Sequence, residues 1–184
     1  MKNSRLYLKF PTMEDKENVL EFKNEFIFYN SSMAGSGGLD QYETYEEWID
    51  KINKDISEET CGENRVPATL YLTYRLEDNK LIGILQIRHY LNAFLLRHGG
   101  HIGDSIRPTE RGNGYSTEQI ALALEECKKL NIKNVLMTCN RQNIASAKSI
   151  RRNGGEMENE IEDNGEVIQR YWISLEKESI KGGA

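Results

Sequence analysis

Two glycines, Gly112 and Gly114, stand two residues apart in RPTERGNGYST (107–117), between a predicted strand and a predicted helix. At a helix start the first backbone N–H groups have no partner inside the helix, and the helix dipole adds partial positive charge. A phosphate group fits such a site. Glycine lets the main chain approach a ligand because it has no Cβ, and Arg111 can add a charged contact. The segment therefore predicts a cradle for a diphosphate.

Two better-known phosphate motifs do not fit this segment. A Walker A loop needs Gly-Lys-Ser/Thr, which does not occur in the chain. A dinucleotide-binding GxGxxG motif needs a glycine where Thr117 stands. The remaining alternative is a plain surface turn, which the segment alone leaves open.

The hydrophobic pattern predicts the elements that would position this segment. Alternating residues predict strands at 4–10, 68–76, 80–90 and 101–106, and a continuous apolar run predicts a buried strand at 134–139. Helical spacing predicts helices after Thr12, at about 44–57, after Ser116 with Gln119 as its capping-box partner, and after Asn143. Two strands around the turn DNG (163–165) close the chain. This order predicts a mixed α/β fold that begins largely antiparallel.

Composition restricts the class of protein. With 184 residues, 38% hydrophobic and 29% charged, the chain predicts a soluble globular protein of one domain (1–184). It shows no membrane-length apolar run and no signal-peptide pattern. Three widely spaced cysteines without a CxxC pair indicate reduced thiols, so we expect a cytoplasmic protein. No metal-type spacing occurs, so we expect no metal.

Charge is unevenly distributed along the chain. Residues 1–64 contain 14 acidic and 7 basic residues, whereas residues 105–152 contain 9 basic and 4 acidic residues. The net charge of −5 disfavours general nucleic-acid binding, which needs a basic domain. The distribution suits an anionic ligand at the basic region and a cationic partner at the acidic region, and chance variation explains it equally well.

On these residues the chain resembles the GNAT superfamily of acyl-CoA-dependent N-acetyltransferases. The superfamily's phosphate motif, Gln/Arg-x-x-Gly-x-Gly/Ala, here reads RGNGYS (111–116), with Ser116 where Gly or Ala is usual. The segment NIASAKSIRRNGG (143–155) is similar to the second half-motif, and RHYLN, GGHIG and QRYW are similar to a bacterial group of predicted acetyltransferases. The resemblance implies the GNAT fold: a central, mixed, mostly antiparallel sheet of about seven strands flanked by about four helices. It also implies acceptor-side helices at about 12–60 and an acetyl-CoA-binding core at about 80–175.

The resemblance further implies which residues bind acetyl-CoA, the expected co-substrate. Main-chain groups at the end of the fourth strand would run beside the pantetheine arm, and the following amides would hold the diphosphate. Asn143 would hydrogen-bond the pantetheine region, a role compatible with capping a helix. The expected binding residues are Asp104, Ser105, Ile106, Arg111, Gly112, Asn113, Gly114, Tyr115, Ser116, Thr117 and Asn143.

The implied reaction is transfer of an acetyl group to a primary amine, by direct attack through a tetrahedral intermediate. The amine must first lose a proton, so a general base is expected. Where many relatives carry a glutamate, this chain has Gly100 and Ile102, and the usual tyrosine position of the last helix holds Ile150.

A histidine is the first candidate for the missing base. His89, His98 and His101 flank the strand that would line the site, and imidazole titrates near neutral pH. We take His101 as the predicted catalytic residue, and Asp104 and His98 are the next candidates.

The identity of the acceptor stays open at this point. The expected partner is an amine: a small cationic molecule such as a polyamine or aminoglycoside, an amino acid, or a protein N-terminus. We expect no nucleic-acid or membrane partner, and a homodimer is left open. The alternative function is a catalytically inactive acyl-CoA-binding module, suggested by the missing glutamate and tyrosine.

Overall fold

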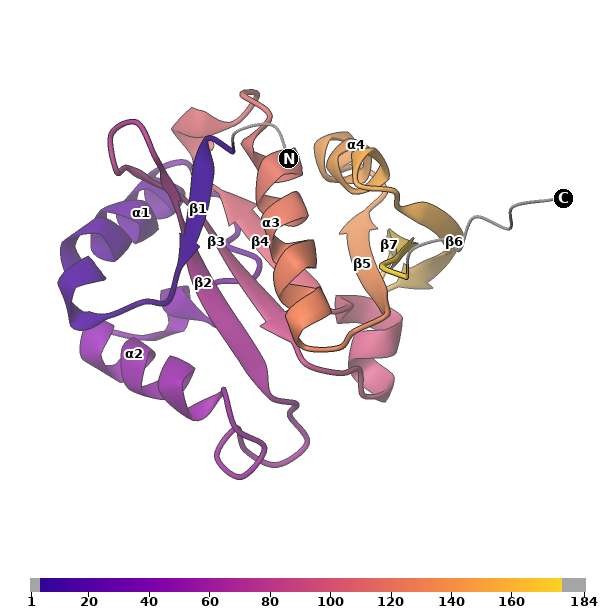
Figure 1. Ribbon diagram of the computed structural model, residues 1–184, viewed down its shortest axis with the longest axis horizontal. Coiled ribbons are helices and arrows are strands. Elements are labelled where there is room, and N and C mark those ends of the chain that lie inside the picture. The colour runs from indigo at the N-terminus through magenta and orange to yellow at the C-terminus, as the bar shows by residue number, and fades with distance from the viewer. Residues whose placement is uncertain (1–3, 177–184) are drawn as a thin grey trace, which may run out of the picture.

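The computed structural model describes residues 4–176, and it contains the predicted strands and helices in the predicted order (Figure 1). The four α-helices are α1 (Lys16–Phe28), α2 (Tyr45–Lys54), α3 (Tyr115–Lys129) and α4 (Ile144–Arg152). The seven strands are β1 (Leu6–Lys9), β2 (Ala68–Arg75), β3 (Leu81–Arg88), β4 (Ile102–Ile106), β5 (Asn134–Asn140), β6 (Glu156–Asp163) and β7 (Glu166–Ser174). Short 3₁₀ segments η1 (Met13–Asp15), η2 (Leu39–Gln41) and η4 (Pro108–Glu110) and one π-helical segment, η3 (Leu95–Gly99), complete the fold.

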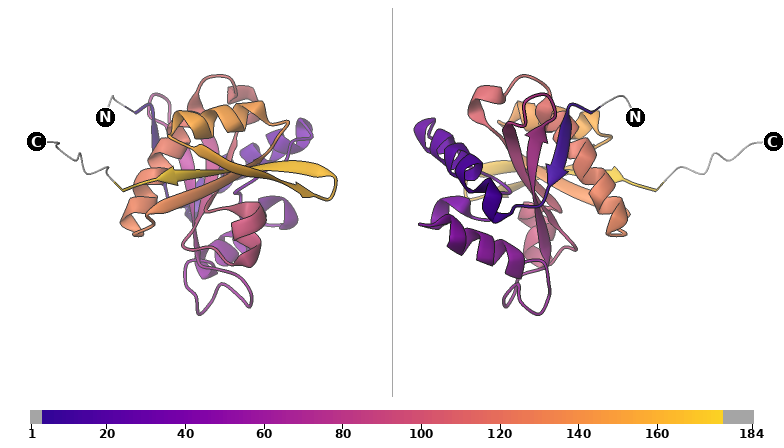
Figure 2. Two further views of the ribbon diagram at one scale, coloured as in Figure 1. Left: turned by 90° about the vertical axis from the view of Figure 1, so that its right-hand side faces the viewer. Right: turned by 60° about the vertical axis from the view of Figure 1, so that its left-hand side comes forward.

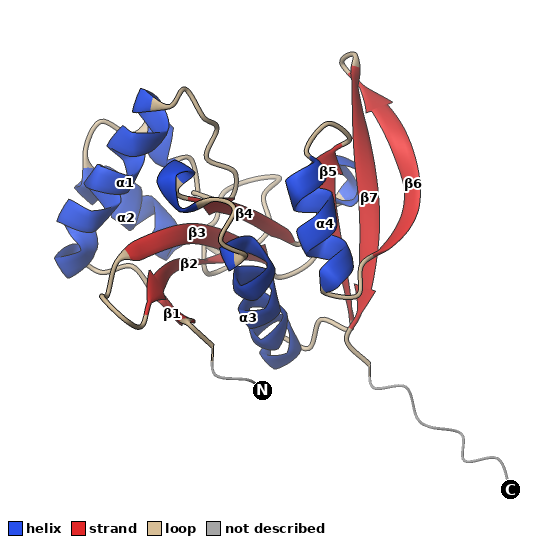
Figure 3. Cartoon of the chain, turned by 90° about the horizontal axis from the view of Figure 1, so that it is seen from above, coloured by secondary structure: helices blue, strands red, loops and turns tan. Residues whose placement is uncertain are grey.

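The strands form two antiparallel sheets rather than one continuous sheet. The first sheet has the order β1-β2-β3-β4, and the second has the order β5-β7-β6. The predicted number of strands and their mixture with four helices are confirmed, but the strands divide between β4 and β5 (Figure 3). The glycine segment 107–117 directly follows β4, the strand at which the division occurs.

Helices cover both faces of the first sheet. Helices α1 and α2 lie on one face and α3 lies on the other (Figures 1 and 2). Phe22 of α1 and Trp48 of α2 are fully buried against Leu72 of β2, as the helical periodicity predicts. On the other face, Ile120 of α3 packs with Leu85 of β3 in a core that continues into the second sheet. Side chains of β4 therefore alternate between the α3 face and the α1–α2 face.

The helix starts are fixed by local hydrogen bonds. Thr44 forms the N-cap of α2, accepts a hydrogen bond from the Glu47 backbone N–H, and has Glu47 reaching back, which is a capping box. Asn143 caps α4, and its Oδ1 accepts from the Ser146 N–H at 3.1 Å. Within residues 4–176, no helix has the length and apolar character that crossing a membrane requires.

Candidate active site

The glycine turn has the geometry that a diphosphate cradle needs. Gly112 and Gly114 both have φ = +83°, a left-handed conformation that side chains rarely adopt, and Gly114 is the N-cap of α3. Among residues 4–176, apart from the two chain neighbours, no atom lies within 4 Å of a Cβ added to Gly112, so the described chain leaves the turn open on that side. The residues present therefore fit an anionic group bound to main-chain amides at the start of a 15-residue helix.

The start of α3 differs from the predicted capping box. The helix begins at Tyr115, one residue before Ser116, because the left-handed Gly114 occupies the N-cap position. The Ser116 hydroxyl is 3.5 Å from Asp104 Oδ2 instead of binding the helix start. Tyr115 is buried, and its hydroxyl accepts a hydrogen bond from Arg75 Nη1. The groups that this turn can offer to a ligand are therefore its main-chain N–H groups.

The arginine predicted to contact the phosphates has other partners. Arg111 Nε donates to the carbonyl of Ile106 at 3.1 Å, and Nη2 donates to Ser31 Oγ at 2.8 Å. The guanidinium therefore ties the end of β4 to the segment after α1. A different cation lies at the turn: Arg5 Nη2 donates to the carbonyl of Asn113 at 3.1 Å. Arg5 was not predictable as part of the site, because it precedes the turn by more than a hundred residues and belongs to no motif.

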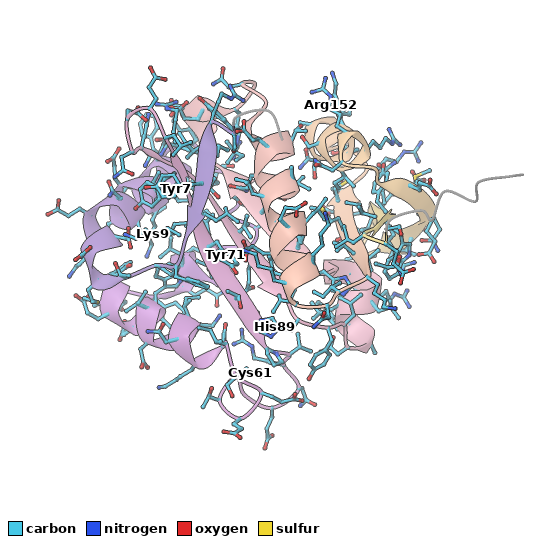
Figure 4. All side chains as sticks on the ribbon, viewed as in Figure 1. Tyr7, Lys9, Cys61, Tyr71, His89 and Arg152 are labelled. Atoms are coloured by element: carbon cyan, nitrogen blue, oxygen red, sulfur yellow. The ribbon has the colours of Figure 1, made fainter. Side chains whose placement is uncertain are left out.

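Helix α4 lies beside the first turn of α3. Asn153 Nδ2 donates to the Thr117 carbonyl at 3.0 Å, and Thr117 Oγ1 donates to Ser149 Oγ at 3.3 Å. Figure 4 shows Arg152 at the end of α4, on the same side of the molecule as the start of α3. The two helices thus bring the glycine motif (111–116) and the second motif (143–155) together, and Arg152 lies at the end of α4 beside them.

The two sheets are joined where β4 begins. The His101 N–H donates to the Leu136 carbonyl at 2.7 Å, and the Leu136 N–H donates to His101 Nδ1 at 2.9 Å. The imidazole nitrogen thus takes the place of a main-chain carbonyl as the acceptor for the Leu136 N–H of β5. Gly100 adopts φ = +64°, and a Cβ there would lie 2.5 Å from the Leu136 carbonyl oxygen. Glycine is therefore required for this close approach.

These contacts give His101 a structural role, and its catalytic role stays a prediction. The ring is buried, and Nδ1, the atom that would accept a proton, already accepts a hydrogen bond. Burial, together with nearby Arg88, lowers the His101 pKa to about 4. The ring is neutral at physiological pH and holds β4 against β5. Within residues 4–176, no contact supports His101 as the base.

Beyond His101, one edge of β4 faces away from its partner β3. The Arg107 N–H donates to Ile82 of β3, and main-chain groups of an antiparallel pair alternate in direction. The N–H and C=O groups of Asp104 and Ile106 therefore point toward β5, whereas those of Ser105 point toward β3. The Ser105 hydroxyl donates to the Ala34 carbonyl at 2.7 Å, on the α1–α2 face. Asp104 and Ile106 are thus the better placed of the three predicted strand residues.

The Asp104 carboxylate lies on the α3 face of β4. Its Oδ2 is 3.5 Å from both Ser116 Oγ and Gln119 Nε2, so both hydrogen bonds are weak. Burial raises the Asp104 pKa to about 6, and the two donors only partly oppose this shift. Burial also raises the pKa of the Cys139 thiol on β5, and Asp104 adds to that effect. Asp104 is therefore a carboxyl group that titrates near neutral pH between the two sheets.

The other two histidines lie apart from Asp104. His98 belongs to η3, and its Nδ1 is 3.3 Å from Asp163 Oδ2 at the end of β6. His89 Nε2 is 2.8 Å from Thr69 Oγ1, and Figure 4 shows His89 near Cys61, at the opposite end of the molecule from Arg152. His89 is therefore remote from the start of α3.

The residues at the relatives' usual catalytic positions are apolar and buried. Ile102 and Ile150 belong to the core between α3 and the second sheet. The structure thus offers no acidic or phenolic group at either position, in agreement with the sequence.

Comparisons with known proteins agree with this architecture. The sequence matches the family profile described as "Acetyltransferase (GNAT) domain" over residues 5–156. No curated protein sequence matches the chain significantly.

Among solved structures, the fold is similar to a ribosomal L7/L12 alpha-N-protein acetyltransferase in complex with coenzyme A. The TM-score is 0.67 at 17% identity, covering 94% of this chain and 95% of the other. It is also similar to an acetyltransferase from Salmonella typhimurium that modifies the N-terminal serine of L7/L12, with a TM-score of 0.63, 18% identity, and coverage of 95% and 97%. A dodecameric spermidine N-acetyltransferase from Vibrio cholerae gives a TM-score of 0.62 at 18% identity, with coverage of 94% and 95%.

The family profile spans most of the chain, and the solved structures share its arrangement of strands and helices. The glycine turn, the start of α3 and the divergence of β4 from β5 lie together at one site. The chain belongs to the GNAT family of acetyl-CoA-dependent N-acetyltransferases.

Proposed function

We propose that the protein transfers the acetyl group of acetyl-CoA to a primary amine, with the diphosphate bound at Gly112–Thr117. The open turn at Gly112 carries this proposal, because residues 111–114 are exposed and no atom of the described residues beyond the chain neighbours lies within 4 Å of a Cβ placed on Gly112. The pantetheine arm would follow the edge of β4 that faces β5, along Asp104 and Ile106, toward the other face of the sheets. A cytoplasmic location and one domain spanning the chain belong to the same proposal.

The main chain of β4 would stabilise the reacting carbonyl. The amine nitrogen attacks the thioester carbon, and the carbonyl oxygen gains negative charge. An N–H group of Asp104 or Ile106 that points toward β5 can donate to this oxygen, and a fixed donor at such a position contributes several kcal/mol in known enzymes, roughly 3. The C–S bond then breaks, and the sulfur leaves as the thiolate of CoA.

Asp104 is the residue we propose for proton transfer. A lysine-like amine has a pKa of about 10.4, so a free amine at neutral pH costs about 4–5 kcal/mol. A base with a pKa near the working pH lowers this cost, and Asp104, with a pKa of about 6, meets that condition. Because its carboxylate lies on the α3 face of β4, it would accept the proton of the attacking amine through bridging water, and it can return a proton to the thiolate.

An assay of thiol release tests this function. Acetyl-CoA is mixed with the protein and a panel of amines that includes spermidine, free amino acids and a peptide with an N-terminal serine. The panel reflects the acceptors of the similar structures, which are spermidine and the N-terminus of L7/L12. Amine-dependent thiol release supports the proposal. CoA binding without release for any amine would instead favour an inactive acyl-CoA-binding module.

A further inference from the structure

A largely buried arginine lacks the acidic partner that comparable arginines have. Arg75, Arg107 and Arg170 have side chains that are 17%, 3% and 11% exposed, and each forms an ion pair with at least one carboxylate. Arg88, at the end of β3, forms none with the part of the chain that the structure describes. Its Nη1 donates only to the carbonyls of Gly99 and Gly100, at 3.1 and 3.3 Å.

Leaving this charge without a counter-ion is costly. Burial lowers the pKa of Arg88, and no carboxylate opposes the shift. Burial is the main cause that lowers the pKa of Lys51 and of His101, and the positive charge of Arg88 adds to both shifts. Lys51 shares the carboxylate of Asp55 with Arg65, at 2.5 and 3.2 Å, so two cations there use one anion. The surroundings of Arg88 therefore carry an excess of positive charge.

Arg88 lies on the side of β4 opposite to Asp104. A Cβ added to Gly103 would point at Gly35 and would lie 3.3 Å from Arg88 Nη1. The neighbouring Asp104 faces α3. The guanidinium thus adjoins the strand whose edge we assign to the pantetheine arm, on the face covered by the segment between α1 and α2. This face is remote from the diphosphate turn at the start of α3.

Two donor atoms of Arg88 remain for a ligand. Both main-chain contacts use Nη1, and the described residues provide no hydrogen-bond partner for Nη2 or Nε. An edge of a guanidinium with two N–H groups matches the two oxygens of a carboxylate. A polyamine would bring positive charge toward Arg88 and Lys51, which repel it.

We propose that Arg88 binds a carboxylate of the acceptor, so that the acceptor is a molecule of the amino-acid class and not a polyamine. This inference rests on the proposed acetyl transfer. It names the acceptor class for the same site. Because the α-carboxylate of an amino acid is one carbon away from the amine, binding it at Arg88 would hold the amine beside β4.

Amino acids and their amides form the test, because an amide keeps the amine and removes the charge. The wild-type protein is assayed with acetyl-CoA and a panel of L-amino acids from each side-chain class, each paired with its L-amino-acid amide. We expect kcat/KM to be at least about tenfold higher for the acid in the preferred pair. An equal or higher value for the amide, or for spermidine, would overturn the assignment.

Two variants then connect the preference to Arg88. Arg88→Gln should reduce the ratio of acid to amide to within about twofold while the Kd for CoA stays unchanged. Arg88→Lys should keep part of the preference because it keeps the charge. An undiminished ratio in a folded Arg88→Gln protein contradicts the proposal.

A binding measurement separates this proposal from the proposed enzyme activity. Calorimetric titration of the CoA-bound wild-type protein with each acid and amide needs no turnover. Binding of an acid but not of its amide supports Arg88 as the carboxylate site even where no thiol is released. Binding of neither compound, or equal binding of both, refutes the site whatever the outcome of the thiol assay.

Discussion

Replacing Gly112 by alanine tests the diphosphate cradle directly. The backbone φ is +83°, and among the described residues beyond its chain neighbours the new Cβ would have no atom within 4 Å. The substitution therefore adds backbone strain of about 1–2 kcal/mol without a clash in the free protein. For a chain of this size each kcal/mol lowers Tm by about 2–4 °C, so we expect a decrease of about 2–8 °C.

Gly165 provides a matched control for this strain. It lies in the turn between β6 and β7, has φ = +81°, and also has no atom within 4 Å of an added Cβ. Gly165→Ala should therefore lower Tm by the same amount as Gly112→Ala. The two variants differ in their distance from α3, so any difference in CoA affinity comes from the turn at Gly112.

The expected difference in affinity follows from the amides of the turn. A hydrogen bond from a main-chain N–H to a charged oxygen contributes about 1.5–3 kcal/mol. A methyl group that keeps the diphosphate away from Gly112 removes at least one such bond. Isothermal titration calorimetry should therefore show the Kd for CoA rising at least about tenfold in Gly112→Ala and unchanged in Gly165→Ala. Equal Kd values in the two variants would refute the cradle.

Three further predictions concern buried charged and titratable groups. The folded-state pKa of Asp104 is raised from 3.8 to about 6, so its ionisation costs stability as pH rises through that interval. Asp104→Asn should therefore raise the free energy of urea unfolding at pH 8 by up to about 3 kcal/mol and leave it unchanged below about pH 4. The same variant should lower kcat. The pKa of His101 is lowered from 6.5 to about 4, so its contribution to the free energy of unfolding is complete above pH 6.5 and is lost as pH falls toward 4. His101→Ala leaves the Leu136 N–H unpaired and should lower the free energy of unfolding at pH 7 by about 1–3 kcal/mol; a wild-type unfolding curve would show that the ring does not join the sheets. Arg107→Ala should lower it by roughly 3 kcal/mol, because the partly buried Glu25 carboxylate loses its cation; a loss below about 1 kcal/mol in urea unfolding would contradict that reading.

The order of the elements was predictable because each depends on local sequence. Alternating and helical periodicity give β2, β3, α2 and α3, since a chain must bury its apolar face whatever its partner is. The glycine turn was predictable for a similar reason. A left-handed turn before a helix needs residues without a Cβ, and Gly112 and Gly114 meet that need.

The division of the sheet could not be predicted from such patterns. The sheets divide between β4 and β5 and stay joined only at the start of β4, where a histidine nitrogen accepts the Leu136 N–H, and periodicity reports only which face a side chain takes. The same limit applies to Arg5, whose partner Asn113 is distant in the sequence. The capping box at Ser116 was wrong because the left-handed Gly114, and not Ser116, is the N-cap, so the helix starts two residues earlier.

The β5-facing side of β4 leaves the protein with an incomplete ladder in its interior. On the surface such an edge would recruit strands of other chains, but here it lies between two sheets of the same molecule. Only a narrow, extended compound with its own amide groups can complete it, and the arm of CoA is such a compound. Acetyl-CoA would then act as a removable strand beside β4. Amide hydrogen exchange at Asp104 and Ile106 should therefore slow when CoA is added and recover when CoA is removed.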